Sequence, residues 1–344
     1  MRQSGILFRA VFFLFRILTV CYNVGYGNNR YFTWKEGMKM QKVLEEALEI
    51  GKQYIEYGNC ASYNPELARV DKNNLGVCII TKSVDRYTAG DTKKRFTIQS
   101  ISKVISLAFA LERLGQEKVF EKMSMEPSGD AFDSLLKLDM ASNKPFNPMI
   151  NAGALATIGY LVADFTFEDM LEYARRVCMD KNIVMDETVY ESEMSHCARN
   201  RAIAYLLQSK GILEHDVEET LKLYTKMCSL SVTAESLANL GLVLASGGRH
   251  PETGVRLMDA EAVRLVKSIM LTCGMYDGSG EFAVRVGIPS KSGVGGGILA
   301  VVEKRMGIGI YGPALDEKGN SIAGQKMLEY LSKTLNLHMF ASEL

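Results

Sequence analysis

The sequence predicts a mixed α/β protein of the α+β type, in which an antiparallel sheet is built from both chain ends and flanked by helices. Two observations predict this fold class. Short runs rich in branched apolar residues lie near both ends of the chain, and apolar residues recur at helical spacing through most of residues 116–271. Strands at both ends around a helical middle are typical of one sheet with a helical lobe inserted into it.

The first part of the chain predicts a helix, a β-hairpin, a strand and a second helix. Gly58-Asn59 would end the first helix, and Ser83-Val84-Asp85 separates the two strands of the hairpin. The expected ranges are 40–57 for the first helix, 75–81 and 86–88 for the hairpin, 96–99 for the next strand, and 100 to about 114 for the second helix.

The middle of the chain predicts helices, and the last part returns to strands. The expected ranges are 167–178, 200–208, 217–227 and 234–245 for helices, 282–286, 296–302 and 306–311 for strands, and 319–337 for a closing amphipathic helix. We expect one domain over residues 38–344, with a sheet lobe at about 38–100 and 272–344 and a helical lobe at about 101–271.

Composition excludes several classes of function. Lysine plus arginine equals aspartate plus glutamate at 40 each, so no excess of positive charge predicts a nucleic-acid surface. The seven cysteines form no CxxC pair, which favours reduced thiols in the cytoplasm. The four histidines lack metal-binding spacing, and no uncharged apolar run is long enough to cross a bilayer. We therefore expect a cytoplasmic protein without a metal, a cofactor or a membrane span.

Residues 1–37 are predicted to be an extension outside the fold. Their apolar run at 10–20 follows two arginines, as in a secretory signal, but Arg16 interrupts it and no small-residue cleavage site follows. Lys35-Glu36-Gly37 back-translates to a purine-rich stretch that resembles a ribosome-binding site. We therefore expect translation to begin later, at Met38 or Met40.

Ser100 and Lys103 have the spacing of a nucleophile and its base. Three residues apart on the first turn of a helix, the two side chains lie on one face. The Lys103 amine can then take the hydroxyl proton while Ser100 attacks a carbonyl carbon. Because Ser100 ends a strand-like run and begins a helix, its own backbone N–H can help to form an oxyanion hole.

The triplet Lys291-Ser292-Gly293 is a second motif with chemical meaning. At the start of a strand, it matches the third motif of serine acyl-transferases of the penicillin-recognising type. The glycines that follow let a substrate approach the strand edge, and the Val294 N–H can supply a second oxyanion donor. Alone, such a triplet is more often a glycine-rich bend, but its order after Ser100 and Lys103 indicates a catalytic site.

Six motifs together resemble the glutaminase family, in family order and at family-like spacing from about Met40 to near the C-terminus. They are Gln99-Ser100-Ile101-Ser102-Lys103, Glu126-Pro127-Ser128-Gly129, Asn147-Pro148-Met149-Ile150-Asn151-Ala152-Gly153, Ser192-Glu193 with Arg199-Asn200, Cys273-Gly274-Met275-Tyr276-Asp277, and Lys291-Ser292-Gly293-Val294. The resemblance implies the fold of serine β-lactamases and penicillin-binding proteins, and hydrolysis of L-glutamine to L-glutamate and ammonia. It also suggests a homodimer or homotetramer.

The resemblance assigns roles to single residues. It makes Ser100 the nucleophile and Lys103 the general base, and it makes the backbone of Val294 a partner of the amide oxygen. Tyr224 and Tyr276 match tyrosines proposed to shuttle protons and bind substrate. The residues that match those holding the α-amino and α-carboxylate groups are Tyr63, Asn151, Glu193 and Asn200.

Other interpretations stay open at this point. Taken singly, Tyr224 and Tyr276 would be core residues, Asn151 a helix cap, and Glu193 and Asn200 part of a solvated helix face. Cys228 and Cys273 are expected only to fill space in the core. A β-lactamase or penicillin-binding peptidase would share the nucleophile, the base and the KSG strand. A binding module on an inactive hydrolase scaffold would have lost one of these elements, and none is missing.

Overall fold

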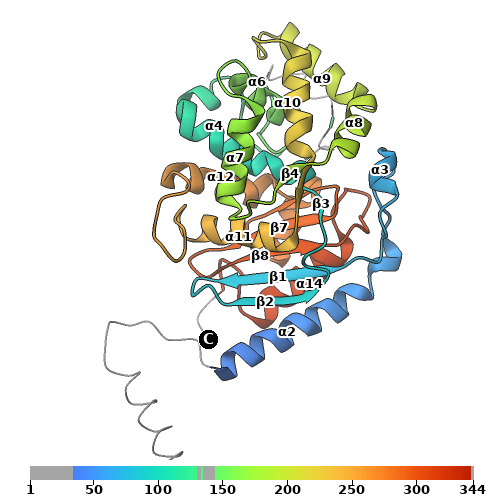
Figure 1. The fold of residues 1–344 in the computed structure, drawn as a ribbon, viewed down its shortest axis with the longest axis vertical. Helices are drawn as coiled ribbons and strands as arrows, with labels where there is room; N and C mark the ends of the chain where they lie inside the picture. Colours follow the sequence, from blue (N-terminus) through green and yellow to red (C-terminus); the bar gives the residue numbers. More distant parts are fainter. Residues whose placement is uncertain (1–33, 130–132, 135–143, 342–344) are drawn as a thin grey trace, which may run out of the picture. The chain divides into compact units, whose positions relative to one another are not determined.

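A five-stranded antiparallel sheet, in the order β2-β1-β8-β7-β6, joins the two ends of the chain (Figure 1). The computed structural model describes residues 34–129, 133–134 and 144–341. The first part of the chain supplies β1 (Gly76–Thr81) and β2 (Arg86–Gly90). The last part supplies β6 (Ser290–Ser292), β7 (Gly297–Val302) and β8 (Met306–Tyr311). The prediction of an antiparallel sheet completed by both chain ends is confirmed.

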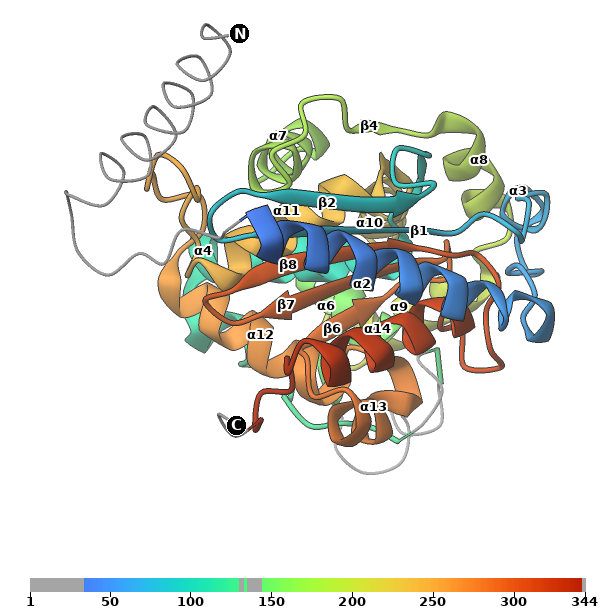
Figure 2. The same cartoon turned by 90° about the horizontal axis from the view of Figure 1, so that it is seen from below.

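Helices cover both faces of this sheet, which explains why its central strands are continuously apolar. Val77 and Ile79 of β1 pack in one core with α2 (Trp34–Lys52) and α14 (Ile322–Thr334), which cross one face in Figure 2. The alternate residues Cys78 and Ile80 face the core that contains α11 (Ala234–Ala245).

Glycines on β8 let α11 lie directly on the sheet. A Cβ atom at Gly309 would stand 1.9 Å from the carbonyl oxygen of Ala234, and one at Gly307 would stand 2.1 Å from that of Ala238. No larger residue fits between the strand and the helix backbone at these two positions. The segment 234–245, expected within the helical lobe, therefore covers the sheet.

A second, three-stranded sheet was not predicted from the sequence. Its order is β3-β5-β4, formed by Phe96–Thr97, Leu230–Val232 and Val184–Met185. Strands of two or three residues are too short to show periodicity. This small sheet matters because the Ile98 N–H donates to the Leu230 carbonyl oxygen at 2.8 Å, so the chain just before Ser100 lies beside the end of α10.

The remaining helices lie mostly on the far side of α11 from the five-stranded sheet (Figure 1). Several begin at the side-chain caps that their sequences predict: Thr166 and Asp169 form a capping box on α7, and Asp186 and Asp216 cap α8 and α10. Their bounds are η1 Ile55–Tyr57, α3 Pro65–Ala68, η2 Gln99–Ile101, α4 Ser102–Val119, α6 Asn151–Leu161, α7 Phe167–Val177, α8 Glu187–Ser195, α9 Ala198–Ser209, α10 Val217–Cys228, α12 Ala260–Cys273, η3 Tyr276–Gly278 and α13 Ser279–Arg285.

Two predicted elements are wrong in type or position. The segment 282–286 was expected to be a strand, but it belongs to helix α13 and its C-cap. Its apolar residues alternate, yet Val284 is 80% exposed while Phe282 and Val286, one helical turn apart, are buried. The KSG triplet does not begin a strand; Lys291 and Ser292 end β6, and the glycines that follow turn the chain into β7.

The predicted N-terminal extension falls largely outside the described residues. Residues 1–33 are not described, and residues 34–37 belong to the start of α2. Among the helices that the structure describes, none combines the length and the apolar character needed to span a membrane.

Candidate active site

A pocket of about 200 Å³ gathers most of the predicted site residues. They come from a turn before α3, from η2, from the helices α6, α8, α9 and α10, and from the β6–β7 turn. The predicted residues that line it are Tyr63, Ser100, Asn151, Glu193, Asn200, Tyr224 and Val294. The other two predicted residues, Lys103 and Tyr276, do not line the pocket, but both are buried beside the residues that do.

Ser100 stands at a strained corner between β3 and α4. Gln99, the residue before it, has φ of 48°, a left-handed conformation that costs about 1 kcal/mol or more for a residue with a side chain. A turn of 3-10 helix over Gln99–Ile101 then leads into α4, so Ser100 and Lys103 share one face as predicted. The Ser100 side chain is buried except where it lines the pocket.

The glycine-rich turn after β6 brings Val294 to Ser100. A Cβ atom at Gly293 would stand 2.8 Å from the Ile98 carbonyl oxygen, and one at Gly295 would stand 2.4 Å from that of Thr97. The turn therefore passes against the backbone that precedes the nucleophile candidate, and only glycine permits this approach. Val294, between the two glycines, lines the same pocket as Ser100.

Lys103 is buried, and both of its hydrogen-bond acceptors are neutral oxygens. Its Nζ donates to Asn151 Oδ1 at 2.7 Å and to the Met149 carbonyl oxygen at 3.3 Å. Burial lowers the pKa of Lys103 from its usual value to about 8, while the charges of Cys228 and Asp133 act in the opposite direction. A large fraction of the amine is therefore unprotonated at slightly alkaline pH, as a general base requires.

Asn151, at the start of α6, links the base to the pocket wall. Its Oδ1 accepts from Lys103 and, at 3.4 Å, from the Tyr224 hydroxyl, while its Nδ2 donates to Asn200 Oδ1 at 2.8 Å. Burial, followed by the Cys228 thiol, raises the pKa of Tyr224 well above its usual value. The Tyr224 hydroxyl therefore keeps its proton at neutral pH and can act as a donor.

Glu193 is a buried carboxylate in the lining of the same pocket. Its Oε1 accepts from the Tyr63 hydroxyl at 2.9 Å and from Gln99 Nε2 at 3.3 Å. Burial raises the pKa of Glu193, and hydrogen bonds from Tyr63, Asn64 and Gln99 oppose that shift. These donors are all neutral, so none of them would neutralise a charged Glu193 carboxylate, which suits a cationic ligand.

Tyr276 lies against the nucleophile candidate. Burial raises the pKa of its hydroxyl, whereas hydrogen bonding to the Ser100 side chain and to the Val294 backbone acts in the opposite direction. Its φ of 54° is a second left-handed backbone conformation beside the site. The hydroxyl is therefore near the Ser100 side chain and the Val294 backbone.

Sequence reasoning gave no role to several residues that the structure places here. Gln99 is the second donor to Glu193, and its only signal was its place next to Ser100 in the first motif. Cys228 was expected only to fill the core, but it lines the pocket and its Sγ lies 3.6 Å from Ser102 Oγ. In the described part of the chain, no three His, Cys, Asp or Glu side chains gather as they would around a metal ion.

Comparison with known proteins decides the family. The glutaminase family model matches residues 58–340. The chain belongs to the glutaminase family. A glutaminase of Clostridium tetani is 49% identical over 305 residues, which are 88% of this chain and all of that relative.

Solved structures of glutaminases share the fold of this family member. The structure of a probable glutaminase, ybaS, has a TM-score of 0.82 at 38% identity and covers 88% of this chain and 99% of its own. A Bacillus subtilis glutaminase, YbgJ, solved as the covalent complex formed by reaction with 6-diazo-5-oxo-L-norleucine, has a TM-score of 0.80 at 38% identity over 88% of this chain and all of its own. The predictions of the family and of its β-lactamase-like fold are confirmed.

Proposed function

We propose that this glutaminase family member hydrolyses L-glutamine to L-glutamate and ammonia, with Ser100 as the nucleophile. One observation carries the proposal: Ser100 and the buried carboxylate Glu193 line one pocket of about 200 Å³, and the buried amine of Lys103 lies beside it. That volume suits a small amino acid, since pockets for drug-sized ligands are larger, about 300–1,000 Å³. The covalent complex of the Bacillus subtilis relative supports a mechanism with a nucleophile of the protein.

The two ends of the pocket fit the two ends of the substrate. Glutamine is a zwitterion, and its ammonium group would bind the Glu193 carboxylate. Asn151 and Asn200 supply amide N–H donors that suit the α-carboxylate, and Tyr63, whose hydroxyl donates to Glu193, orients the Glu193 carboxylate. With the amino-acid end held there, the side-chain amide extends toward Ser100 and Val294.

Acylation would begin when Lys103 accepts the Ser100 proton and Ser100 Oγ attacks the amide carbon. The oxygen of the tetrahedral intermediate would be held by the backbone N–H groups of Ser100 and Val294. Ammonia leaves after its nitrogen takes a proton from Tyr224, which Lys103 then supplies with the proton from Ser100. Tyr224 and Lys103 both donate to Asn151 Oδ1, so the two groups lie near each other in the free site.

Deacylation would use the same groups in reverse. Water attacks the γ-glutamyl ester with Lys103 again accepting a proton, and Ser100 regains its hydroxyl as glutamate leaves. The Tyr276 hydroxyl, which lies near the Ser100 side chain, would keep the nucleophile oriented through both half-reactions.

We expect the purified chain to release ammonia from L-glutamine far faster than from L-asparagine. Asparagine is one methylene shorter, so its amide carbon is drawn away from Ser100 when the amino-acid end is anchored. The rates can be compared in a coupled ammonia assay. Equal turnover of the two amides would refute the proposed anchoring, and no release from a folded protein would favour the binding-module interpretation.

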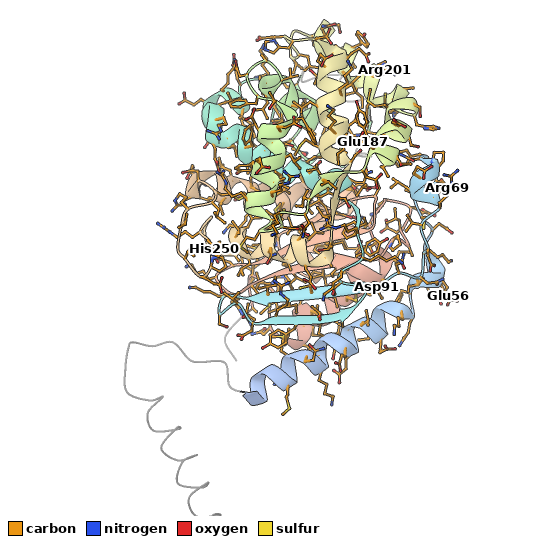
Figure 3. The ribbon with its side chains drawn as sticks, in the orientation of Figure 1. Glu56, Arg69, Asp91, Glu187, Arg201 and His250 are labelled. Atoms are coloured by element: carbon orange, nitrogen blue, oxygen red, sulfur yellow. The ribbon has the colours of Figure 1, made fainter. Side chains whose placement is uncertain are left out.

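Glu193→Gln is expected to raise KM for glutamine by about 30- to 100-fold, because a charge-assisted hydrogen bond to the ammonium is worth roughly 2–3 kcal/mol. The value of kcat should fall much less. The matched control is Glu187→Gln on the same helix α8; that side chain is exposed and labelled in Figure 3. Steady-state kinetics test this, and a wild-type KM in Glu193→Gln would remove Glu193 from the substrate site.

We also propose that residues 38–344 form a single catalytic domain, that the protein is cytoplasmic, and that it assembles as a homodimer or homotetramer. Family membership supports these three statements. Light scattering of the purified chain tests the assembly, and a monomer at working concentration would contradict it. A β-lactamase-like activity is the weaker alternative, since the small pocket with its buried carboxylate disfavours a bulky acyl substrate.

A further inference from the structure

Lys291, at the end of β6, is a fully buried lysine to which the proposed mechanism gives no role. Its Nζ donates to the Ser292 carbonyl oxygen at 2.6 Å, and no carboxylate acts on it among the charged groups of the described residues. An ammonium without a paired anion is costly to bury, so a residue that only filled this space would be apolar. The amine therefore has a task at this position.

The ring of Tyr276 is the group on which Lys291 acts. The Lys291 Nζ lies 4.5 Å from the centroid of that ring. The two segments are also joined through the backbone, because the Ser292 N–H donates to the Gly274 carbonyl oxygen at 3.0 Å, two residues before Tyr276. The Lys291 amine therefore contacts the face of the Tyr276 ring, and strand β6 holds the backbone just before Tyr276.

The position of this ring matters because its hydroxyl meets both Ser100 and Val294. Tyr276 holds a left-handed backbone conformation, which persists only where the surroundings enforce it. A shift of the ring would move the hydroxyl away from the Ser100 side chain and the Val294 backbone. A contact on the face of the ring opposes such a shift directly.

Burial lowers the pKa of Lys291 well below its usual value, and the charge of Lys103 acts in the same direction. The amine donates to the Ser292 carbonyl oxygen and can direct a further N–H at the face of the Tyr276 ring.

We propose that Lys291 is a positioning residue, whose amine holds the Tyr276 ring where the tyrosine hydroxyl meets Ser100 and Val294. This inference rests on the proposed function of Ser100. It gives the lysine of the KSG triplet a role that acts through Tyr276 and not through contact with glutamine.

The test is a double-mutant cycle on the full-length chain with Lys291→Met, Tyr276→Phe and the double variant. Lys291→Met is expected to lower kcat for glutamine by about 10- to 100-fold and to leave KM within about threefold, since the Glu193 side of the pocket is unchanged. In the Tyr276→Phe background, where no hydroxyl remains to be positioned, the same substitution should change kcat by less than about threefold.

A matched cycle pairs Lys291→Met with Glu193→Gln, a residue of the pocket lining with no recorded contact to Lys291, and there the two effects on kcat/KM should multiply. The inference is overturned if Lys291→Met lowers kcat equally in the wild-type and Tyr276→Phe backgrounds, or if it leaves kcat unchanged. Thermal unfolding checks that each variant is folded. Lys291→Leu, which also lacks an N–H donor, replaces Lys291→Met in the cycle if the methionine variant does not fold.

Failure of the proposed function is recognised separately, by a wild type that releases no ammonia. In that case the crystal structures of the wild type and Lys291→Met decide the inference. A Tyr276 hydroxyl that leaves Ser100 in the variant supports the positioning role, and an unmoved ring overturns it.

Discussion

Ser100→Ala is expected to lower kcat for ammonia release from glutamine by about 10⁴-fold or more, the loss that follows removal of a nucleophile in hydrolases with covalent intermediates. The substitution removes the oxygen that attacks the amide carbon, and no water is positioned to replace it at a comparable rate. Glutamine should still bind, because the residues around Glu193 are untouched.

Ser102→Ala is the matched control for this prediction. Ser102 lies two residues along the same turn, is buried, and contacts Cys228 instead of facing the pocket. It should keep most of the activity. Stopped ammonia assays give kcat, and calorimetric titration gives glutamine affinity; a Ser100→Ala variant with wild-type turnover would exclude the serine mechanism.

Lys103→Met is expected to lower kcat by about 10³-fold, within the range that general acid–base groups contribute. The methionine fills the buried space without offering an amine to the Ser100 proton. Two further contacts are lost, since Asn151 Oδ1 and the Met149 carbonyl oxygen no longer accept from Lys103. The loss should appear mainly in kcat, because Lys103 acts on the nucleophile.

The same lysine predicts the pH dependence of the wild type. The reactive form is the neutral amine, and burial lowers its pKa to about 8. The value of kcat/KM should therefore fall about tenfold per pH unit below pH 8 and level off above it. In Lys103→Met the residual kcat/KM should not show this fall below pH 8. A fall that persists near pH 8 in the variant would assign the titration to another group.

The parts of the fold that the sequence predicted are those with long, regular apolar patterns. Helix α11 and strand β8 match the expected ranges 234–245 and 306–311, because each has an uninterrupted pattern of buried residues. The alternation at 282–286 led to a wrong assignment, because three apolar residues fit both a strand and a helix and only tertiary contacts select between them. The two- and three-residue strands β4 and β5 gave no periodic signal at all.

Within the site, the predicted residues do lie together, but the sequence could not show how they are connected. Ser100 and Lys103 were predictable because a fixed spacing on one helix turn sets their geometry. Gln99 and Lys291 lie in predicted motifs but received no roles of their own, because their contacts depend on what folds against them: the Glu193 carboxylate and the Tyr276 ring. The catalytic roles themselves stay predictions that the substitutions above test.

Covalent labelling with 6-diazo-5-oxo-L-norleucine tests the central claim, that Ser100 is the nucleophile, most directly. After reaction, intact mass and peptide mapping should place a 5-oxo-L-norleucine group on Ser100, and Ser100→Ala should remain unlabelled. Cys228 lines the same pocket and provides an internal comparison. A label on Cys228, or on any residue other than Ser100, would contradict the account.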